Sequence, residues 1–140
     1  MAQELNLHGY NLDIDLIKGS GLVHDVARIY ERHDLIGYEI LTEMGYLDEA
    51  NIVKVHMKYP KYNEIQNLDE CDIICLADRV VKENKYVGLG ERMEDIINKV
   101  PEGNPDIIER ILLKKDETKE LLDQIAQIIG KTLDELFIDK

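Results

Sequence analysis

Apolar residues in this sequence recur at intervals of three and four, and no stretch of useful length alternates apolar with polar side chains. The first spacing is that of one face of an α-helix, whereas alternation would indicate a β-strand. The three prolines, Pro60, Pro101 and Pro105, all fall between the periodic segments, where they do not interrupt a helix. The sequence therefore predicts an all-α protein.

Several expected helices carry signals at their ends. Asp13 can cap the second helix, Gly45 closes the third, and Asp69 or Asp72 can cap the fifth. The expected ranges are 2–7, 13–29, 33–44, 48–58, 68–85, 91–99, 106–129 (as one or two helices) and 132–137.

Two glycines, Gly19 and Gly21, fall inside the second expected helix. A glycine in a helix interior costs roughly 1 kcal/mol relative to alanine. Their presence predicts that the helix packs closely against another backbone at this point.

Length and charge restrict the classes of function. The chain has 140 residues, the size of one domain, and 29 acidic residues against 17 basic ones give a net charge of −12. Binding along a nucleic-acid backbone requires many lysines and arginines, so no nucleic-acid partner is expected. A small anionic substrate would need local positive charge, which a metal ion supplies most cheaply.

The sequence also indicates where the protein works. It contains no apolar run near the roughly 20 residues that a membrane helix requires, so no membrane partner is expected. The opening residues MAQELNLHGY lack the basic and apolar regions of a signal peptide. Cys71 and Cys75 fit two reduced packing cysteines. Together these features predict a cytoplasmic protein.

Five polar residues, His24, Asp25, His33, His56 and Asp78, lie on the apolar faces of four expected helices. A buried carboxylate is costly unless it is paired, hydrogen-bonded or bound to a cation. Imidazole and carboxylate together form the ligand set of Zn, Fe, Mn and Co sites, which are often built in the cores of helical bundles.

Each of these residues also has a purely structural interpretation. A histidine on a helix face is commonly satisfied by a carbonyl group or by water. Asp25 could form a helical ion pair with Arg28, and Asp78 a partly exposed pair with Arg79. The spacing alone leaves both interpretations open.

The local context of these residues resembles the signature of the HD-domain superfamily of metal-dependent phosphohydrolases, whose hallmark is a His-Asp pair at the end of an apolar helix. The resemblance covers residues 1–99 and implies an HD-domain-like helical bundle. In chain order it rests on GLVHDVAR at 21–28, His33 followed by DLIGYEILTEM, IVKVH at 52–56 and IICLADR at 73–79.

The resemblance implies a role for each residue. His24, Asp25 and Asp78 match ligands of a primary metal, while His33 and His56 match the histidines of members with a second metal, which Asp25 would bridge. The implied cofactor is one or two divalent transition metal ions: Fe, Mn, Zn, Co or Ni. The implied reaction is hydrolysis of a small phosphate ester by a metal-activated water.

Arg28 stands where many members of this superfamily carry a lysine. It is a candidate for contacting substrate phosphate, with Asp25 as the other catalytic candidate; an exposed role on the helix surface is the alternative for Arg28. Tyrosines and lysines are candidates for the walls of a substrate pocket: Tyr59, Tyr62, Tyr86, Lys58 and Lys61.

One feature departs from the superfamily pattern, which opens with a further metal-binding histidine well upstream of the His-Asp pair. The only earlier histidine here is His8, 16 residues before His24 and beside Gly9 at an expected helix end. We therefore expect an N-terminally incomplete metal-binding core. Apolar surface exposed by the missing half-helix would favour a homodimer.

Two regions and three functions are expected. Residues 1–99 would form the metal-binding helical core, and residues 100–140 would add amphipathic helices that pack on the same domain. The chain would hydrolyse a nucleotide or another small phosphorylated substrate. The first alternative is a catalytically impaired HD-fold binding or regulatory module, and the second is a helical interaction protein in which residues 106–137 meet a partner.

Overall fold

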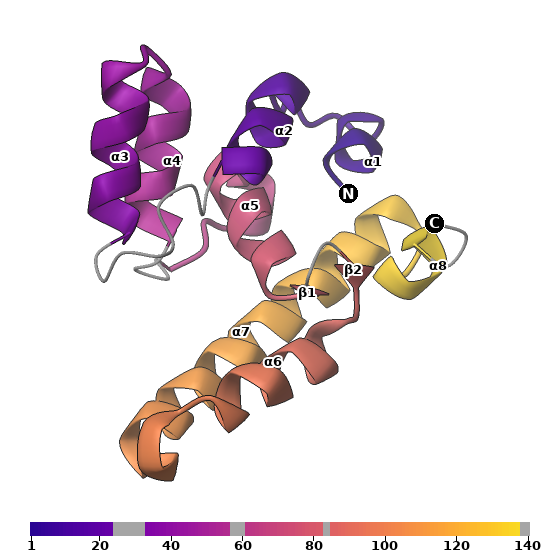
Figure 1. The fold of residues 1–140 in the computed structure, drawn as a ribbon. Helices are drawn as coiled ribbons and strands as arrows, with labels where there is room; N and C mark the ends of the chain where they lie inside the picture. The colour runs from indigo at the N-terminus through magenta and orange to yellow at the C-terminus, as the bar shows by residue number, and fades with distance from the viewer. Residues whose placement is uncertain (24–32, 57–60, 83–84, 138–140) are drawn as a thin grey trace. The chain divides into compact units, whose positions relative to one another are not determined.

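The computed structural model of the chain describes residues 1–23, 33–56, 61–82 and 85–137; for residues 22, 23, 33–35 and 56 it describes the backbone alone. Helices dominate these ranges, which confirms the all-α prediction (Figure 1). The α-helices and the two short strands are α1 (Ala2–Asn6), α2 (Ile14–Val23), α3 (His33–Glu43), α4 (Leu47–His56), α5 (Glu70–Asp78), β1 (Val81–Lys82), β2 (Lys85–Tyr86), α6 (Leu89–Asn98), α7 (Pro105–Ile129) and α8 (Leu133–Phe137).

The chain divides into two compact units. The central unit comprises Ala2 and residues 11–75, and the terminal unit comprises Met1, residues 3–10 and residues 76–140. Helix α5 contributes its first six residues to the central unit and its last three to the terminal unit. No helix in the described part of the chain is long and apolar enough to cross a membrane.

The central unit contains a helical hairpin made of α3 and α4, which pack side by side (Figure 1). Leu41, Ala50 and Val53 form its buried core, and Tyr38 packs against them. The turn is made at Gly45, whose positive φ of 87° is accessible to glycine at little cost. Helix α2 in turn packs on α4.

Aspartates begin two helices of this unit, as the sequence predicts. Asp13 Oδ1 accepts a hydrogen bond of 3.0 Å from the amide of Leu16, and Asp69 Oδ1 accepts one of 2.9 Å from the amide of Asp72. The Asp13 amide also donates to Glu70 Oε1 at 3.0 Å. The start of α2 is therefore tied to the start of α5.

The terminal unit is organised along α7, a single helix that α6 packs against. Asn104 caps it by accepting a hydrogen bond from the amide of Asp106, Pro105 occupies its first turn, and Gly130 ends it with a φ of 73°. Its buried side chains recur at helical spacing and form the core face of the helix: Thr118, Leu121, Ile125 and Ile129.

The prediction of one helix over 68–85 is wrong beyond Asp78. The amides of Arg79 and Val80 bond to the carbonyls three residues earlier, which tightens and ends the helix, and β1 then pairs antiparallel with β2. Consecutive β-branched residues, Val80 and Val81, favour extended backbone over helix. The carbonyl of Val80 fixes the hairpin by accepting from the amides of Val87 and Gly88.

Among the residues that the structure describes, Gly19 and Gly21 do not pack closely against another backbone, contrary to expectation. A Cβ atom at Gly19 would meet the side chain of Glu49 at 3.6 Å, and one at Gly21 would meet Ile74 Cδ1 at 3.8 Å. Both distances are ordinary contacts with side chains, so an alanine Cβ at either position would clash with none of the described residues.

We therefore expect Gly21→Ala to raise the free energy of unfolding by about 0.5–1 kcal/mol, because alanine restricts the unfolded chain and fits the helix. The matched variant Gly45→Ala, in the same unit, should lower it by about 1–2 kcal/mol, because its left-handed backbone penalises a Cβ atom. Urea unfolding followed by circular dichroism measures both. A loss of stability in Gly21→Ala would contradict the assigned packing.

Candidate metal site

The structure describes the predicted site residues to different extents. His24, Asp25 and Arg28 lie outside the described residues. His33 is the first residue of α3 and His56 the last of α4, and for both the backbone is described. Asp78 is the last residue of α5 and is half-buried.

The fold of the central unit brings His33 and His56 to the same end of one hairpin. Helices α3 and α4 follow each other through the tight turn at Gly45 and pack side by side (Figure 1). In such a hairpin the first residue of one helix lies beside the last residue of the other. Two histidines separated by 22 intervening residues in the sequence are thus at neighbouring positions.

The described part of α2 ends at Val23, one residue before the predicted His-Asp pair. Near this end Gly21 lies against Ile74 of α5. The His-Asp pair therefore follows a segment of α2 that packs beside α5 within the central unit.

Asp78 is held through its backbone by α6. Its carbonyl oxygen accepts a hydrogen bond from Arg92 Nε at 3.1 Å, and Arg92 Nη1 donates to Asp95 Oδ2 at 3.3 Å. Asp95 also receives Lys82 Nζ at 2.9 Å and Lys99 Nζ at 3.1 Å. We call Lys82, Arg92, Asp95 and Lys99 the Asp95 network.

The Asp95 network has a definite electrostatic character. Hydrogen bonds from Lys82 and then Lys99 stabilise the carboxylate, so the pKa of Asp95 is lowered from its usual value. Since three cations surround one anion, the cluster carries net positive charge in a chain that is acidic overall.

Arg79, next to Asp78, is buried with 2% of its surface exposed. Asp78 itself is half-buried, so the two neighbouring residues differ in their exposure to solvent.

The donor set chosen from the sequence fits a divalent transition metal by its chemistry, since neutral imidazole and carboxylate oxygen are its ordinary protein ligands. Among the side chains that the structure describes, no three His, Cys, Asp or Glu residues form a metal-binding group. Of the five predicted ligands, that set of side chains includes only Asp78.

Two other residue types add no metal ligand to this set. Neither cysteine forms a disulfide, and the pKa of Cys71 is raised, chiefly by its hydrogen bond to Cys75 and by burial, so the thiol stays protonated. His8 is exposed, and its Nδ1 donates to the carbonyl of Glu4 in its own turn at 2.9 Å.

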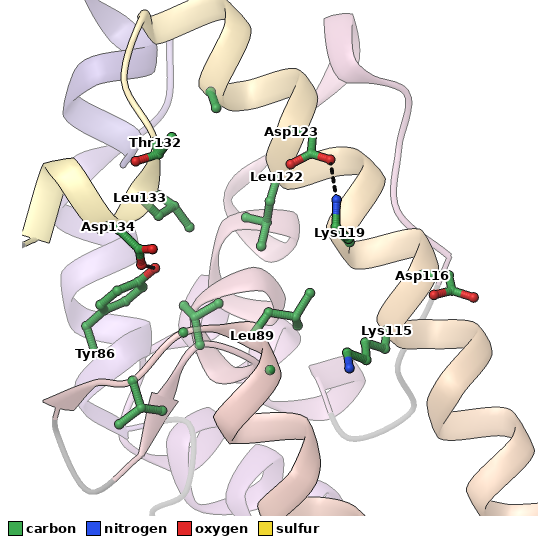
Figure 2. A pocket seen from close by; sticks show the side chains of 15 residues that line it. Tyr86, Leu89, Lys115, Asp116, Lys119, Leu122, Asp123, Thr132, Leu133 and Asp134 are labelled. Atoms are coloured by element: carbon green, nitrogen blue, oxygen red, sulfur yellow. Dashed lines mark hydrogen bonds and ion pairs between the residues drawn. The ribbon is translucent and has the colours of Figure 1, made fainter.

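A pocket of about 710 Å³ lies in the terminal unit between α7, the hairpin and the start of α8 (Figure 2). Tyr86 lines it, donates to Asp134 Oδ1 at 2.6 Å and stacks on Phe137 at 4.9 Å. Lys119 in the wall is paired with Asp123 at 2.9 Å. Because the wall mixes paired charges of both signs with apolar side chains, it selects no class of ligand.

Of the residues predicted to line a substrate pocket, Tyr86 lines this one. Lys58 and Tyr59 lie outside the described residues, Lys61 is exposed and Tyr62 is half-buried. Arg92 and Asp95 were not among the predicted residues, although their i,i+3 spacing on an amphipathic helix indicates a pair.

The sequence matches the HD domain family over residues 1–82, more than half of the chain. The chain belongs to the HD-domain family, which defines a superfamily of metal-dependent phosphohydrolases whose members typically bind divalent metals. An uncharacterized protein of Methanocaldococcus jannaschii is 26% identical over 138 residues, an alignment that covers 87% of this chain and 81% of that protein. No solved structure matches the chain.

The lowered pKa of Asp95 gives a testable pH dependence. A carboxyl group whose pKa is lower in the folded state adds stability above its unfolded pKa of about 3.9, and that stability is lost as the pH falls through the folded value. The difference in unfolding free energy between the unsubstituted protein and Asp95→Asn should therefore shrink below pH 4.

Urea unfolding at a series of pH values from 2.5 to 7 measures this difference. Asp116→Asn, at an exposed position of α7, is the matched control and should change stability little at any pH. A difference for Asp95→Asn that grows in acid would contradict the assigned network.

Proposed function

We propose that the chain is a metal-dependent phosphohydrolase that cleaves a nucleotide or another small phosphate ester. The observation that carries the proposal is membership of the HD-domain family over the segment that contains all five predicted ligands. The position of His33 and His56 at one end of the α3–α4 hairpin supports it, because ligands far apart in sequence must converge to share a metal.

Each residue has a role in this proposal. His24, Asp25 and Asp78 would hold a primary divalent ion, and His33 and His56 would hold a second one with Asp25 between them. When bound, such an ion acidifies a water molecule and polarises the phosphate. Arg28 would bind substrate phosphate through its planar guanidinium donors.

The acidic character of the chain favours a site with its own local cations. A net charge of −12 repels a phosphorylated substrate at long range. Binding would therefore depend on cations placed at the site itself, which a metal ion and Arg28 would supply.

The first test is the metal content of the purified protein, measured by elemental analysis. We expect close to one or two equivalents of Fe, Mn, Zn, Co or Ni, and a loss of most of this metal in Asp25→Ala. Asp15→Ala, an exposed position on α2, is the matched control and should retain the metal. Less than about a tenth of an equivalent after metal soaking would count against a metal site.

The second test is hydrolysis of nucleoside monophosphates and of p-nitrophenyl phosphate. Chelation should abolish turnover, re-addition of the metal should restore it, and Asp25→Ala should lower kcat/KM by about 100-fold or more. Asp15→Ala should retain activity.

A catalytically impaired binding or regulatory module is the second candidate. This candidate rests on His8, whose exposed side chain bonds to the Glu4 carbonyl in its own turn and adds no ligand to the five predicted ones. Stoichiometric metal with no turnover of any phosphate ester would support this candidate, whereas robust hydrolysis would exclude it.

A further inference from the structure

Asp78 occupies a weak point of the fold, the last residue of α5. The final carbonyl groups of a helix lack intrahelical partners, and helix ends without other partners are prone to fray. The Asp78 carbonyl is one of these groups because the chain leaves the helix and enters β1 at Val81. Arg92 Nε satisfies it at 3.1 Å.

A second contact from α6 holds the same segment four residues later. Lys82 of β1 donates to Asp95 Oδ1 at 2.9 Å, while Asp95 Oδ2 receives Arg92. Arg92 and Asp95 lie on one face of α6 at i,i+3 spacing, and their side chains are 20% and 17% exposed. Helix α6 is therefore hydrogen-bonded to both ends of the segment 78–82, at the Asp78 carbonyl and the Lys82 side chain, through one connected set of hydrogen bonds.

We infer that Arg92 and Asp95 are positioning residues that hold Asp78 where it can ligate a metal ion. The inference rests on the proposed function, which makes Asp78 a ligand. A metal ligand must be held close to its productive geometry, and its supporting hydrogen bonds commonly contribute 10- to 100-fold to metal affinity. Here the support from Arg92 acts on the backbone of the ligand.

The two positioning residues lie outside the segment matched to the family. That segment ends at residue 82 and contains Asp78 and Lys82, while Arg92 and Asp95 follow it. The family-matched segment would therefore depend on α6 for the geometry of its last ligand.

The test is a titration of the metal-free full-length protein with Co²⁺, followed by visible absorption, together with its melting temperature without metal. Arg92→Met keeps the length of the side chain and removes its donors, and we expect about tenfold weaker Co²⁺ binding. Asp95→Asn should weaken binding in the same direction. Arg110→Met, the same change at an exposed position of α7, is the matched control and should leave Co²⁺ affinity unchanged.

Three results would decide the question. Weaker Co²⁺ binding in folded Arg92→Met or Asp95→Asn, with Arg110→Met unchanged, would support the positioning role. A lower melting temperature with unchanged Co²⁺ affinity would assign these residues a structural role alone and overturn the inference while leaving the proposed function intact. Failure of the unsubstituted protein to bind either Co²⁺ or Mn²⁺ would overturn both.

Discussion

The end of helix α5 is the constraint on which the terminal unit depends. At Asp78 the chain leaves a helix and enters a hairpin, so a backbone carbonyl loses its helical partner. Arg92 replaces that partner, and Asp95 joins Arg92 to Lys82 on the strand that follows. The Asp95 carboxylate thus connects three elements. It bonds directly to Lys82 of β1, and through Arg92 of α6 it is linked to the end of α5.

The net positive charge of the Asp95 network contrasts with the acidic character of the whole chain. Acidic residues outnumber basic ones by 12, yet three cations converge on Asp95. An isolated exposed ion pair contributes little to stability, whereas several charges joined in one network contribute more.

Much of the fold could be predicted from local chemistry, and the departures have physical causes. Asp13, Gly45, Asp69 and Gly130 mark helix ends, because capping and positive φ depend on one or two residues. The hairpin after α5 was missed because Val80 and Val81 fit an apolar helix face as well as a strand. The folded chain shows that the helix stops there, through the β1–β2 pairing and the contacts of α6 with Asp78 and Lys82.

For the candidate site, the superfamily pattern is local around each residue. It was therefore enough to predict His24, Asp25, His33, His56 and Asp78 as ligands, and this set stays a prediction. Arg92 could not be assigned in this way, since its acceptor is a backbone carbonyl 14 residues away, and a carbonyl leaves no trace in residue type. Support of this kind becomes visible only when the chain is folded.

Tyr86 lines the pocket and also joins α8 to the hairpin through its hydrogen bond to Asp134. Burial, together with its hydrogen bond to Asp134, raises the pKa of Tyr86, so this contact is complete at neutral pH and is lost only as the pH rises above the usual range for tyrosine. The Asp95 network behaves in the opposite way and weakens in acid. The contacts that α8 and α6 make with the hairpin are therefore weakened at opposite ends of the pH scale.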